Sequence, residues 1–372
     1  MNADERAAWL RLALTPGLGP RTARALLSTF GLPQHIFAAS AAALRQVVPE
    51  ALATTLAAPP ESALARAIGT AEQWLAAAPN RFLLTLADAD YPALLLASHD
   101  PPPLLFAEGR RALLATPMLA IVGSRSCSRQ GAATAEAFAQ SLARAGLTIV
   151  SGLASGIDAA AHRGALRAAA EGGPASTIAV VGTGIDRVYP AANRWLAEQI
   201  RAHGLLLSEF ALGTPALAHN FPRRNRILAA LGRGVLVVEA ALHSGSLITA
   251  RIAAELGREV FAIPGSIHAP TAKGCHRLIK EGAKLVESAA DILEELRLSA
   301  AAAGKPTANT ASDALPPPLR TLLAVIGHDP VDVDTLAARS GLDTGHLTAA
   351  LLELELAEYV ERLPGNRYQR IK

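Results

Sequence analysis

The stretch Leu119-Ala120-Ile121-Val122-Gly123-Ser124-Arg125 decides the fold of this chain, because an apolar run ends there in a glycine turn and a helical pattern follows. The same unit recurs downstream. Five further β-rich runs are each followed by a glycine-containing turn and a helical pattern: Leu147–Val150, Ile178–Val181, Leu205–Leu207, Val235–Val238 and Val260–Ile263. Strands that alternate with helices indicate βαβ crossovers and a parallel sheet covered on both faces.

Glycines support this pattern at the ends of the expected helices. Gly146, Gly204, Gly232 and Gly257 each stand shortly before the next strand, where a helix ends most easily. We therefore predict an α/β protein whose central domain, residues 118–298, is a Rossmann-like, doubly wound and mostly parallel sheet.

Two smaller modules flank the expected sheet. Residues 1–80 have helical apolar spacing, and Pro16-Gly17-Leu18-Gly19-Pro20 breaks it as in a helix–hairpin–helix turn, so we predict a helical module of the SAM or helix–hairpin–helix type. Its near-neutral charge favours a structural or assisting role. The prolines of residues 81–117 predict an extended transition. Residues 299–315 have the composition of a flexible linker. Three helical patterns and a short hairpin over 316–372 predict a winged-helix domain.

Composition limits the classes of protein to which the chain can belong. Hydrophobic residues make up 51% of it, but no apolar run of transmembrane length lacks a charge. The acidic N-terminus is unlike a signal peptide, and two cysteines cannot build a disulfide framework. We expect a cytoplasmic protein with no membrane partner.

Charge is distributed unevenly along the chain. Residues 111–298 hold 20 basic and 14 acidic side chains, whereas residues 313–372 hold 6 and 9. An anionic partner is therefore expected at the central domain.

Four loops meet at the carboxyl edge of the predicted sheet, where open α/β sheets bind their ligands. They are Gly123-Ser124-Arg125, the segment Ser151–Asp158, the segment Gly182–Pro190 and the segment Ser244–Ala250. None has the Gly-x-Gly-x-x-Gly spacing of a dinucleotide site. Glycines such as Gly152 and Gly156 let the backbone approach a bulky anion, and Ser244 and Ser246 are expected at a helix N-terminus that suits a phosphate.

The densest basic cluster is Asn220-Phe221-Pro222-Arg223-Arg224-Asn225-Arg226. Guanidinium groups match phosphate geometry and stay charged at ordinary pH, so the cluster predicts anion binding. Only 4% of the residues are aromatic, so we expect phosphate contacts to dominate over a long base-stacking surface.

Six motifs occur in order and together resemble the DNA-processing protein DprA (Smf) family. They are Gly-Ser-Arg, Ser-Gly-x-Ala-x-Gly-Ile-Asp, Gly-x-Gly-x-x-x-x-Tyr-Pro, Phe-Pro-x-Arg-Asn-Arg-Ile, Ser-Gly-Ser-Leu-x-Thr-Ala and Gly-Arg-Glu-Val-Phe-Ala-Ile-Pro-Gly. The resemblance covers about Leu119 to Leu296. It implies sequence-independent binding and protection of single-stranded DNA, loading of the RecA recombinase in natural transformation, and a homodimer formed through the Rossmann-like domain.

The resemblance also implies which residues contact DNA. They are Ser124, Arg125, Gly152, Gly156, Arg223, Arg224, Asn225 and Arg226, with Ser244, Ser246 and Lys273 as weaker candidates. The family usually has Gly-Thr-Asn before Leu-Ile at the last motif. This chain has Gly274-Cys275-His276-Arg277 there, so a DNA contact at that point is in doubt.

Two enzyme readings compete with DNA binding. A nucleotide hydrolase of the phosphoribohydrolase type shares the architecture, but its Pro-Gly-Gly-x-Gly-Thr turn is missing here. A nuclease could gather Mg²⁺ with four acidic residues near strand ends, for which helix capping and pairing with arginine are the favoured roles: Asp158, Asp186, Glu209 and Glu239. Asp158 and His162 have the spacing to pair on one helical face. We expect no enzyme activity, no cofactor and no metal; Cys275, His276 and His268 lack a second ligand pair for zinc.

The expected recognition helix of the winged-helix domain, Thr344–Glu355, has no arginine or lysine and ends with two glutamates. A helix in the major groove meets a dense phosphate field and needs cations. We predict that this domain adds little DNA affinity and contacts protein instead.

Overall fold

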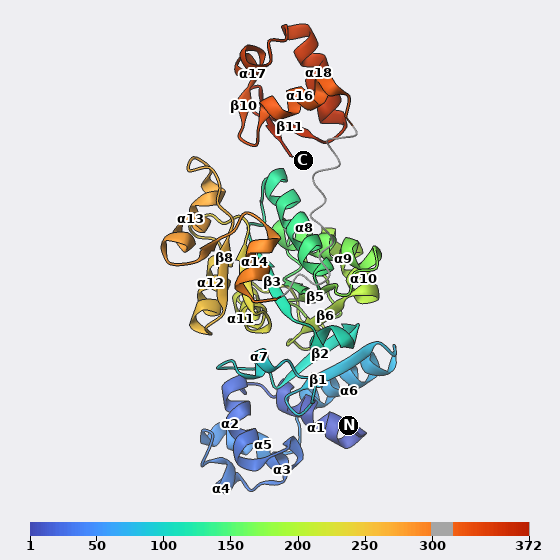
Figure 1. The fold of residues 1–372 in the computed structure, drawn as a ribbon. Coiled ribbons are helices and arrows are strands. Elements are labelled where there is room, and N and C mark those ends of the chain that lie inside the picture. The colour runs from blue at the N-terminus through green and yellow to red at the C-terminus, as the bar shows by residue number, and fades with distance from the viewer. Residues whose placement is uncertain (299–314, 372) are drawn as a thin grey trace.

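The computed structural model describes residues 1–298 and 315–371, and Figure 1 shows the three parts of the chain in order from bottom to top. The linker predicted over 299–315 lies outside the described residues, except for Leu315. None of the helices in the described ranges is long and apolar enough to cross a membrane.

The N-terminal part is helical, as predicted. It contains α1 (Ala3–Leu14), α2 (Pro20–Phe30), α3 (Pro33–Ala38), α4 (Ala41–Leu44), α5 (Glu50–Ala57) and α6 (Ser62–Ala76). A capping box between Asn2 and Glu5 starts α1, and Pro20 at the first position of α2 follows the Gly-Leu-Gly turn. These helices share a core with the central sheet, in which Trp9 and Leu26 lie with Phe106 and Leu206.

A nine-stranded sheet forms the centre of the molecule. Its order is β1-β2-β6-β5-β4-β3-β7-β8-β9, and the seven strands from β6 to β9 in this order are parallel. The strand bounds are β1 (Arg81–Thr85), β2 (Leu104–Gly109), β3 (Met118–Val122), β4 (Thr148–Ser151), β5 (Thr177–Val180), β6 (Leu205–Ser208), β7 (Gly234–Val237), β8 (Glu259–Ala262) and β9 (Lys284–Leu285). The six predicted strands are present within about one residue of their expected ends, and the predicted fold class is confirmed.

The segment 81–117 is more than a transition between modules. Strands β1 and β2 add to the sheet in antiparallel orientation, and β2 pairs with β6. The expectation that prolines keep this segment non-helical is wrong at α7 (Ala93–Leu96), which begins directly after Pro92, and at the 3₁₀ helix η1 (Arg111–Ala115). A proline that precedes a helix removes no hydrogen bond from it, so Pro92 permits α7.

Helices cover both faces of the sheet because successive strand residues point to opposite sides. On one face, Leu119 and Ile121 pack with α8 (Arg129–Arg144), α9 (Ile157–Ala170) and α14 (Ala289–Glu295). On the other, Ala120 and Val122 pack with α11 (Asn220–Leu231), α12 (Ser246–Glu255) and α13 (Lys273–Lys280). Helix α10 (Arg194–His203), next to the 3₁₀ turn η2 (Ala191–Asn193), shares a core with the N-terminal helices; η3 (Pro270–Ala272) precedes α13.

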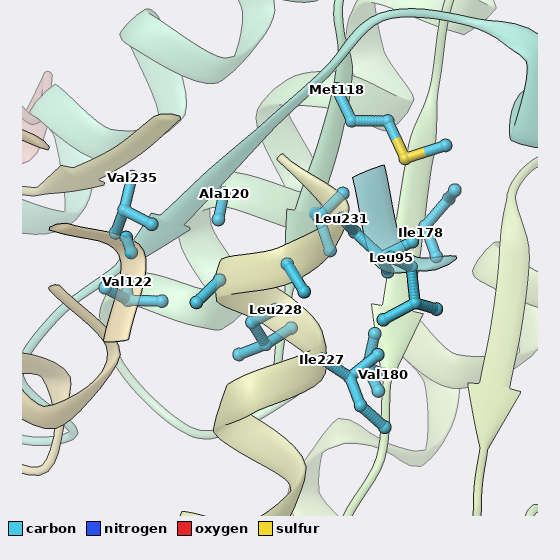
Figure 2. Packing of buried hydrophobic residues seen from close by; sticks show 14 of the residues in the cluster. Leu95, Met118, Ala120, Val122, Ile178, Val180, Ile227, Leu228, Leu231 and Val235 are labelled. Atoms are coloured by element: carbon cyan, nitrogen blue, oxygen red, sulfur yellow. The ribbon is translucent and has the colours of Figure 1, made fainter. Parts of the chain in front are cut away.

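Helix α11 is fixed on the sheet by its apolar side. Figure 2 shows Ile227, Leu228 and Leu231 of this helix among Val122 and Val180 of the strands. The buried C-terminal half of the helix therefore sets the position of its polar N-terminal turns, which carry the arginine cluster.

The C-terminal part is a winged helix, as predicted. It has α16 (Pro317–Ile326), α17 (Val333–Ser340), α18 (Thr344–Leu356) and a three-stranded sheet of β10 (Val331–Asp332), β12 (Arg367–Arg370) and β11 (Val360–Leu363). Asp332 and Asp343 cap α17 and α18. Its own core includes Leu322, Leu347 and Tyr368.

Candidate nucleic-acid interface

The strand order reverses between β3 and β7, and a hollow of about 500 Å³ lies just beyond their carboxyl ends. This is the topological switch point at which open α/β sheets bind ligands. The lining comes from the loop after β3, the loop after β7 and the first turns of α11. We call it the rim hollow, and it contains these residues among others: Ser124, Arg125, Ser126, Ala154, Asp158, Phe221, Arg224, Asn225, His243, Ser244, Ser246 and Thr249.

The loop after β3 is held open toward the rim hollow by its backbone. Ser124 donates its N–H to the carbonyl of Glu239 at 2.7 Å, which ties this loop to the end of β7. Gly156 has a φ of 75°, and a Cβ there would lie 2.3 Å from the carbonyl oxygen of Ser124, so only glycine fits. The Arg125 guanidinium lies 5.3 Å from the centre of the Phe221 ring and has no ion pair in the part of the chain that the structure describes.

The N-terminus of α12 forms the opposite side of the rim hollow. Ser246 is its first residue, and the hydroxyl groups of Ser244 and Ser246 are 2.7 Å apart. The Thr249 hydroxyl is buried without a hydrogen-bond partner in the described residues. The first N–H groups of α12 donate within the turn, from Leu247 to the Ser244 carbonyl and from Ile248 to the Gly245 carbonyl, so the polar groups left at this end are hydroxyls. That Ser244 and Ser246 contact an anion stays a prediction.

Arg224 lies in the wall of the rim hollow, but its side chain is a structural group as well. It is only 3% exposed, and its Nη1 donates to the carbonyl oxygens of Gly152, at 2.7 Å, and of Val180. A Cβ at Gly152 would lie 2.3 Å from this guanidinium, so a larger residue there would displace the Arg224 side chain. Burial lowers the pKa of Arg224 to about 10, so the group stays charged at neutral pH, with Asp158 acting in the opposite direction.

The other two arginines of the cluster do not line the rim hollow. Arg226, with a side chain 12% exposed, pairs with the buried carboxylate of Glu209 and donates to the Asp100 carbonyl oxygen. Arg223 is half-exposed, 3.4 Å from Glu209 and 5.5 Å from the centre of the Phe210 ring. Burial raises the pKa of Glu209, and Arg226 opposes this effect. Arg226 is therefore engaged with a carboxylate and lies outside the lining of the rim hollow, and its contact with DNA stays a prediction.

The helical geometry of α11 explains this division. Phe221, Asn225 and Leu228 are spaced at i, i+4 and i+7, and all three line the rim hollow. Arg223 and Arg226 fall on other sides of the helix. Helical spacing from Asn225 predicts that Phe221 lies on the same side of α11, a site residue that the charge pattern alone did not indicate. No comparable pattern in the sequence marks Ser126 or His243.

Comparison with known proteins identifies the family. The family model described as DNA recombination-mediator protein A matches residues 82–297, more than half of the chain, and the DprA winged helix domain matches residues 306–366. The chain belongs to the DprA (Smf) family.

Relatives cover most of the chain. It is 44% identical to Protein Smf of Escherichia coli over 301 residues, 79% of this chain and 78% of that protein. Identity to Protein Smf of Synechocystis is 36% over the whole of both chains. The X-ray structure of DNA processing protein A from Streptococcus pneumoniae matches with a TM-score of 0.61 at 39% identity, over 77% of this chain and 95% of that one.

A second solved DprA structure is described by what it binds. It concerns the single-stranded DNA binding mode of DNA processing protein A from Helicobacter pylori. The TM-score is 0.52 at 29% identity, over 58% of this chain and 95% of that chain.

The last motif of the DprA resemblance lies apart from the rim hollow. Lys273 is exposed at the start of α13 and is not among the lining residues. Cys275 is buried, with its sulfur 3.6 Å from two carbonyl oxygens of the β7 end, and burial raises the pKa of its thiol. His276 contacts the Gly265 carbonyl oxygen at 2.9 Å through Nε2. The departure from Gly-Thr-Asn therefore places a packing residue at Cys275.

The predicted pairing of Asp158 with His162 is wrong. Asp158 accepts hydrogen bonds from the N–H groups of Gly152, at 3.0 Å, and Ala154. His162 is fully buried, and burial lowers its pKa to about 3, so it is neutral. Its Nε2 accepts from the Leu153 N–H at 3.3 Å, while Nδ1 donates to the Thr177 hydroxyl, which itself donates to a carbonyl oxygen. Both side chains stabilise the loop after β4.

The acidic residues considered for a nuclease or a hydrolase each have a local partner. Asp186 accepts from the Gly213 N–H at 2.8 Å, and Glu239 accepts from the backbone and hydroxyl of Ser128. Asp158 and Glu209 are engaged as described above. Within residues 1–298 and 315–371, no three metal-ligating side chains form a cluster.

Proposed function

We propose that this protein binds single-stranded DNA without sequence preference, with the phosphate backbone held in the rim hollow. The observation that carries the proposal is the set of donors around this space: the Arg125 and Arg224 guanidinium groups and the Ser244 and Ser246 hydroxyls at the start of α12. The Helicobacter pylori relative that is described by its single-stranded DNA binding mode supports it.

The chemistry of these donors favours backbone over base recognition. Guanidinium, hydroxyl and N–H groups all suit phosphate oxygens, which carry no sequence information. Arg224 holds its charge in a buried position, where attraction to an anion is screened less than at an exposed site. Arg125 is exposed and has no carboxylate partner in the described part of the chain, so its charge is free to attract a strand. Binding should weaken steeply as salt rises.

The finer parts of the proposal come from membership of the DprA family. They are protection of incoming strands, loading of RecA in natural transformation, and action in the cytoplasm. Recovery of intact labelled strands after nuclease treatment tests protection, and RecA filament growth on strands already coated by a single-strand binding protein tests loading. Unchanged filament growth would count against the loading role.

Replacement of Arg125 tests the site directly. Arg125→Ala should weaken binding of an oligothymidylate by about 1.5–3 kcal/mol, the range for a hydrogen bond to a charged group. Fluorescence anisotropy at two salt concentrations measures this, and the slope of log affinity against log salt should fall by about 1.

Arg129→Ala is the matched control, because Arg129 is exposed on α8 and pairs with Glu361 outside the rim hollow. It should bind like the wild type. If both variants bind equally well, the rim hollow is not the DNA site.

We also propose a homodimer through the β9 edge of the sheet. Leu242, Ile248 and Leu285 are exposed on this side, and Leu242 and Ile248 line a second hollow of about 790 Å³. Exposed apolar groups of this kind mark protein interfaces. Ile248→Glu should turn a dimer into a monomer in sedimentation equilibrium. Leu96→Glu should not, because Leu96 lies in α7, between β1 and β2 in the chain, and β1 is the edge strand opposite to β9. A wild-type monomer at all concentrations would refute this part.

A further inference from the structure

The loop after β5 and the first turn of α10 that follows it carry two exposed aromatic side chains. Tyr189 is 50% exposed and Trp195 is 68% exposed. The chain has three tryptophans, and the other two are covered: Trp9 is 4% exposed, and Trp74 packs edge-on against Phe106. Packing inside the protein does not explain why a tryptophan stands at position 195, because most of its side chain is in contact with solvent.

This loop is fastened to the rim hollow at two points. The Tyr189 ring lies 5.6 Å from the ring of Phe221, which lines the rim hollow beneath Arg125. The Asn193 side-chain amide donates to the carbonyl oxygens of Leu153, at 2.9 Å, and Ala154, at 3.1 Å, and Ala154 also lines the hollow. The two exposed rings therefore stand on a fixed extension of the rim.

The same stretch of chain, from the loop after β5 into the first turn of α10, carries positive charge. Arg187 and Arg194 are exposed, and neither has an ion pair within the described ranges. The nearby carboxylates are engaged: Asp186 accepts from the Gly213 N–H, and Glu198 pairs with Arg201. One cation without an ion pair thus stands one or two residues before each of the two aromatic rings.

We propose that the stretch from Asp186 to Trp195, which leads from the loop after β5 into the first turn of α10, is a second subsite for single-stranded DNA, in which bases stack on Tyr189 and Trp195 while Arg187 and Arg194 contact the adjacent phosphates. The inference rests on the proposed function, because the strand reaches this loop from the rim hollow over Phe221. Six residues span at most about 20 Å, so one short stretch of strand contacts both rings. Every base has an aromatic face, so such stacking is independent of sequence.

The subsite changes the expectation drawn from composition. Aromatic residues are only 4% of the chain, yet the exposed ones near the rim are gathered where a strand would leave the rim hollow. Local placement, rather than overall content, decides whether bases can stack.

Trp195 supplies its own signal for the experiment. Full-length protein is titrated with oligothymidylates of about 4 and about 16 nucleotides, the range of site sizes for single-strand binding folds, while tryptophan emission and anisotropy are recorded. A base stacked on Trp195 should quench the emission of the wild type and of Trp74→Phe. Tyr189→Ala/Trp195→Ala should bind the longer strand about 10- to 100-fold more weakly and the shorter strand almost normally.

A strand that lacks bases over half of its length separates stacking from charge. The wild type should bind it more weakly than the intact strand, whereas Tyr189→Ala/Trp195→Ala should bind both alike. Arg187→Ala/Arg194→Ala should reduce the salt slope by about 2.

The outcomes distinguish this inference from the proposed function. If Arg125→Ala loses affinity but the aromatic double variant binds both lengths like the wild type, the second subsite is refuted and the rim hollow stands. If neither the wild type nor any variant binds single strands, the proposed function itself fails. If the wild type binds single strands but its tryptophan emission is not quenched, stacking on Trp195 is also refuted.

Discussion

The rim hollow and helix α18 are the two surfaces of this protein on which nucleic-acid binding is expected from fold alone, and they differ in charge. The rim hollow has Arg125 and Arg224 in its lining. Helix α18 occupies the place of a recognition helix but has Glu353 and Glu355 near its end, and its Leu356 is 77% exposed. A position in the fold is therefore not enough for nucleic-acid binding, which also needs cations and free hydrogen-bond donors.

The two regions also differ in what they bury. The α/β body buries Asp158, His162 and Arg224 around the loops of the rim. The winged helix, over its described residues 315–371, buries no polar or charged side chain. Buried ionisable groups make the stability of the α/β body depend on their protonation. In the winged helix, hydrogen bonds hold the pKa values of the capping residues Asp332 and Asp343 below their ordinary value, so this domain loses stability only at a more acidic pH.

Acid should therefore separate the two regions, and this is the largest effect that we expect. Unfolded His162 binds a proton near its ordinary pKa of 6.5, whereas the folded group does so only near 3. Its contribution is fully present above pH 6.5 and is lost as the pH falls toward 3, up to about 5 kcal/mol. Denaturant unfolding followed by tryptophan emission reports the N-terminal helices and the central sheet, which share a core and together contain all three tryptophans.

His162→Gln serves as the control for acid, because it keeps an acceptor for the Leu153 N–H but does not titrate. Its unfolding free energy should fall less between pH 6.5 and 3. The protection of residues 315–371 against hydrogen exchange, after correction for the intrinsic rate at each pH, should change little from pH 6.5 down to the ordinary aspartate pKa of 3.8. Equal pH dependence of wild type and variant would contradict the role given to His162.

Removal of the buried guanidinium is the second test of the comparison. Arg224→Ala leaves the carbonyl oxygens of Gly152 and Val180 without their buried donor, so it should lower the free energy of unfolding by about 1–3 kcal/mol for each of them. Arg339→Ala on the exposed surface of α17 should change it by less than about 0.5 kcal/mol. Denaturant titration measures both, and an Arg224→Ala protein as stable as the wild type would remove the structural role of this side chain.

The smallest expected effect is on the winged helix. Truncation of residues 315–372 should change the affinity for an oligothymidylate by less than about 0.5 kcal/mol, because α18 offers no cation to phosphates. The contacts that are lost, Gln369 with Gln130 and Glu361 with Arg129, lie outside the rim hollow. A tenfold loss of affinity in fluorescence anisotropy would contradict the proposed division of roles.

Some parts of the site could be predicted from the sequence because they depend on local rules. Ser124, Arg125, Ser244 and Ser246 follow strands β3 and β7, and strand ends of a parallel sheet meet at one edge. Arg226 could not be assigned in this way. Its partner Glu209 is 17 residues earlier in the chain, after another strand, and nothing in the local pattern links the two.

The sequence by itself determined the order of strands and helices along the chain, the winged helix and the positive charge of the central domain. Periodicity, glycine turns and charge are properties of residues that are neighbours in the sequence. Only the tertiary structure decided which arginine lines the rim hollow. Whether a guanidinium meets a carbonyl oxygen, a carboxylate or an open hollow depends on segments that the fold brings together, and the burial that results sets its energy.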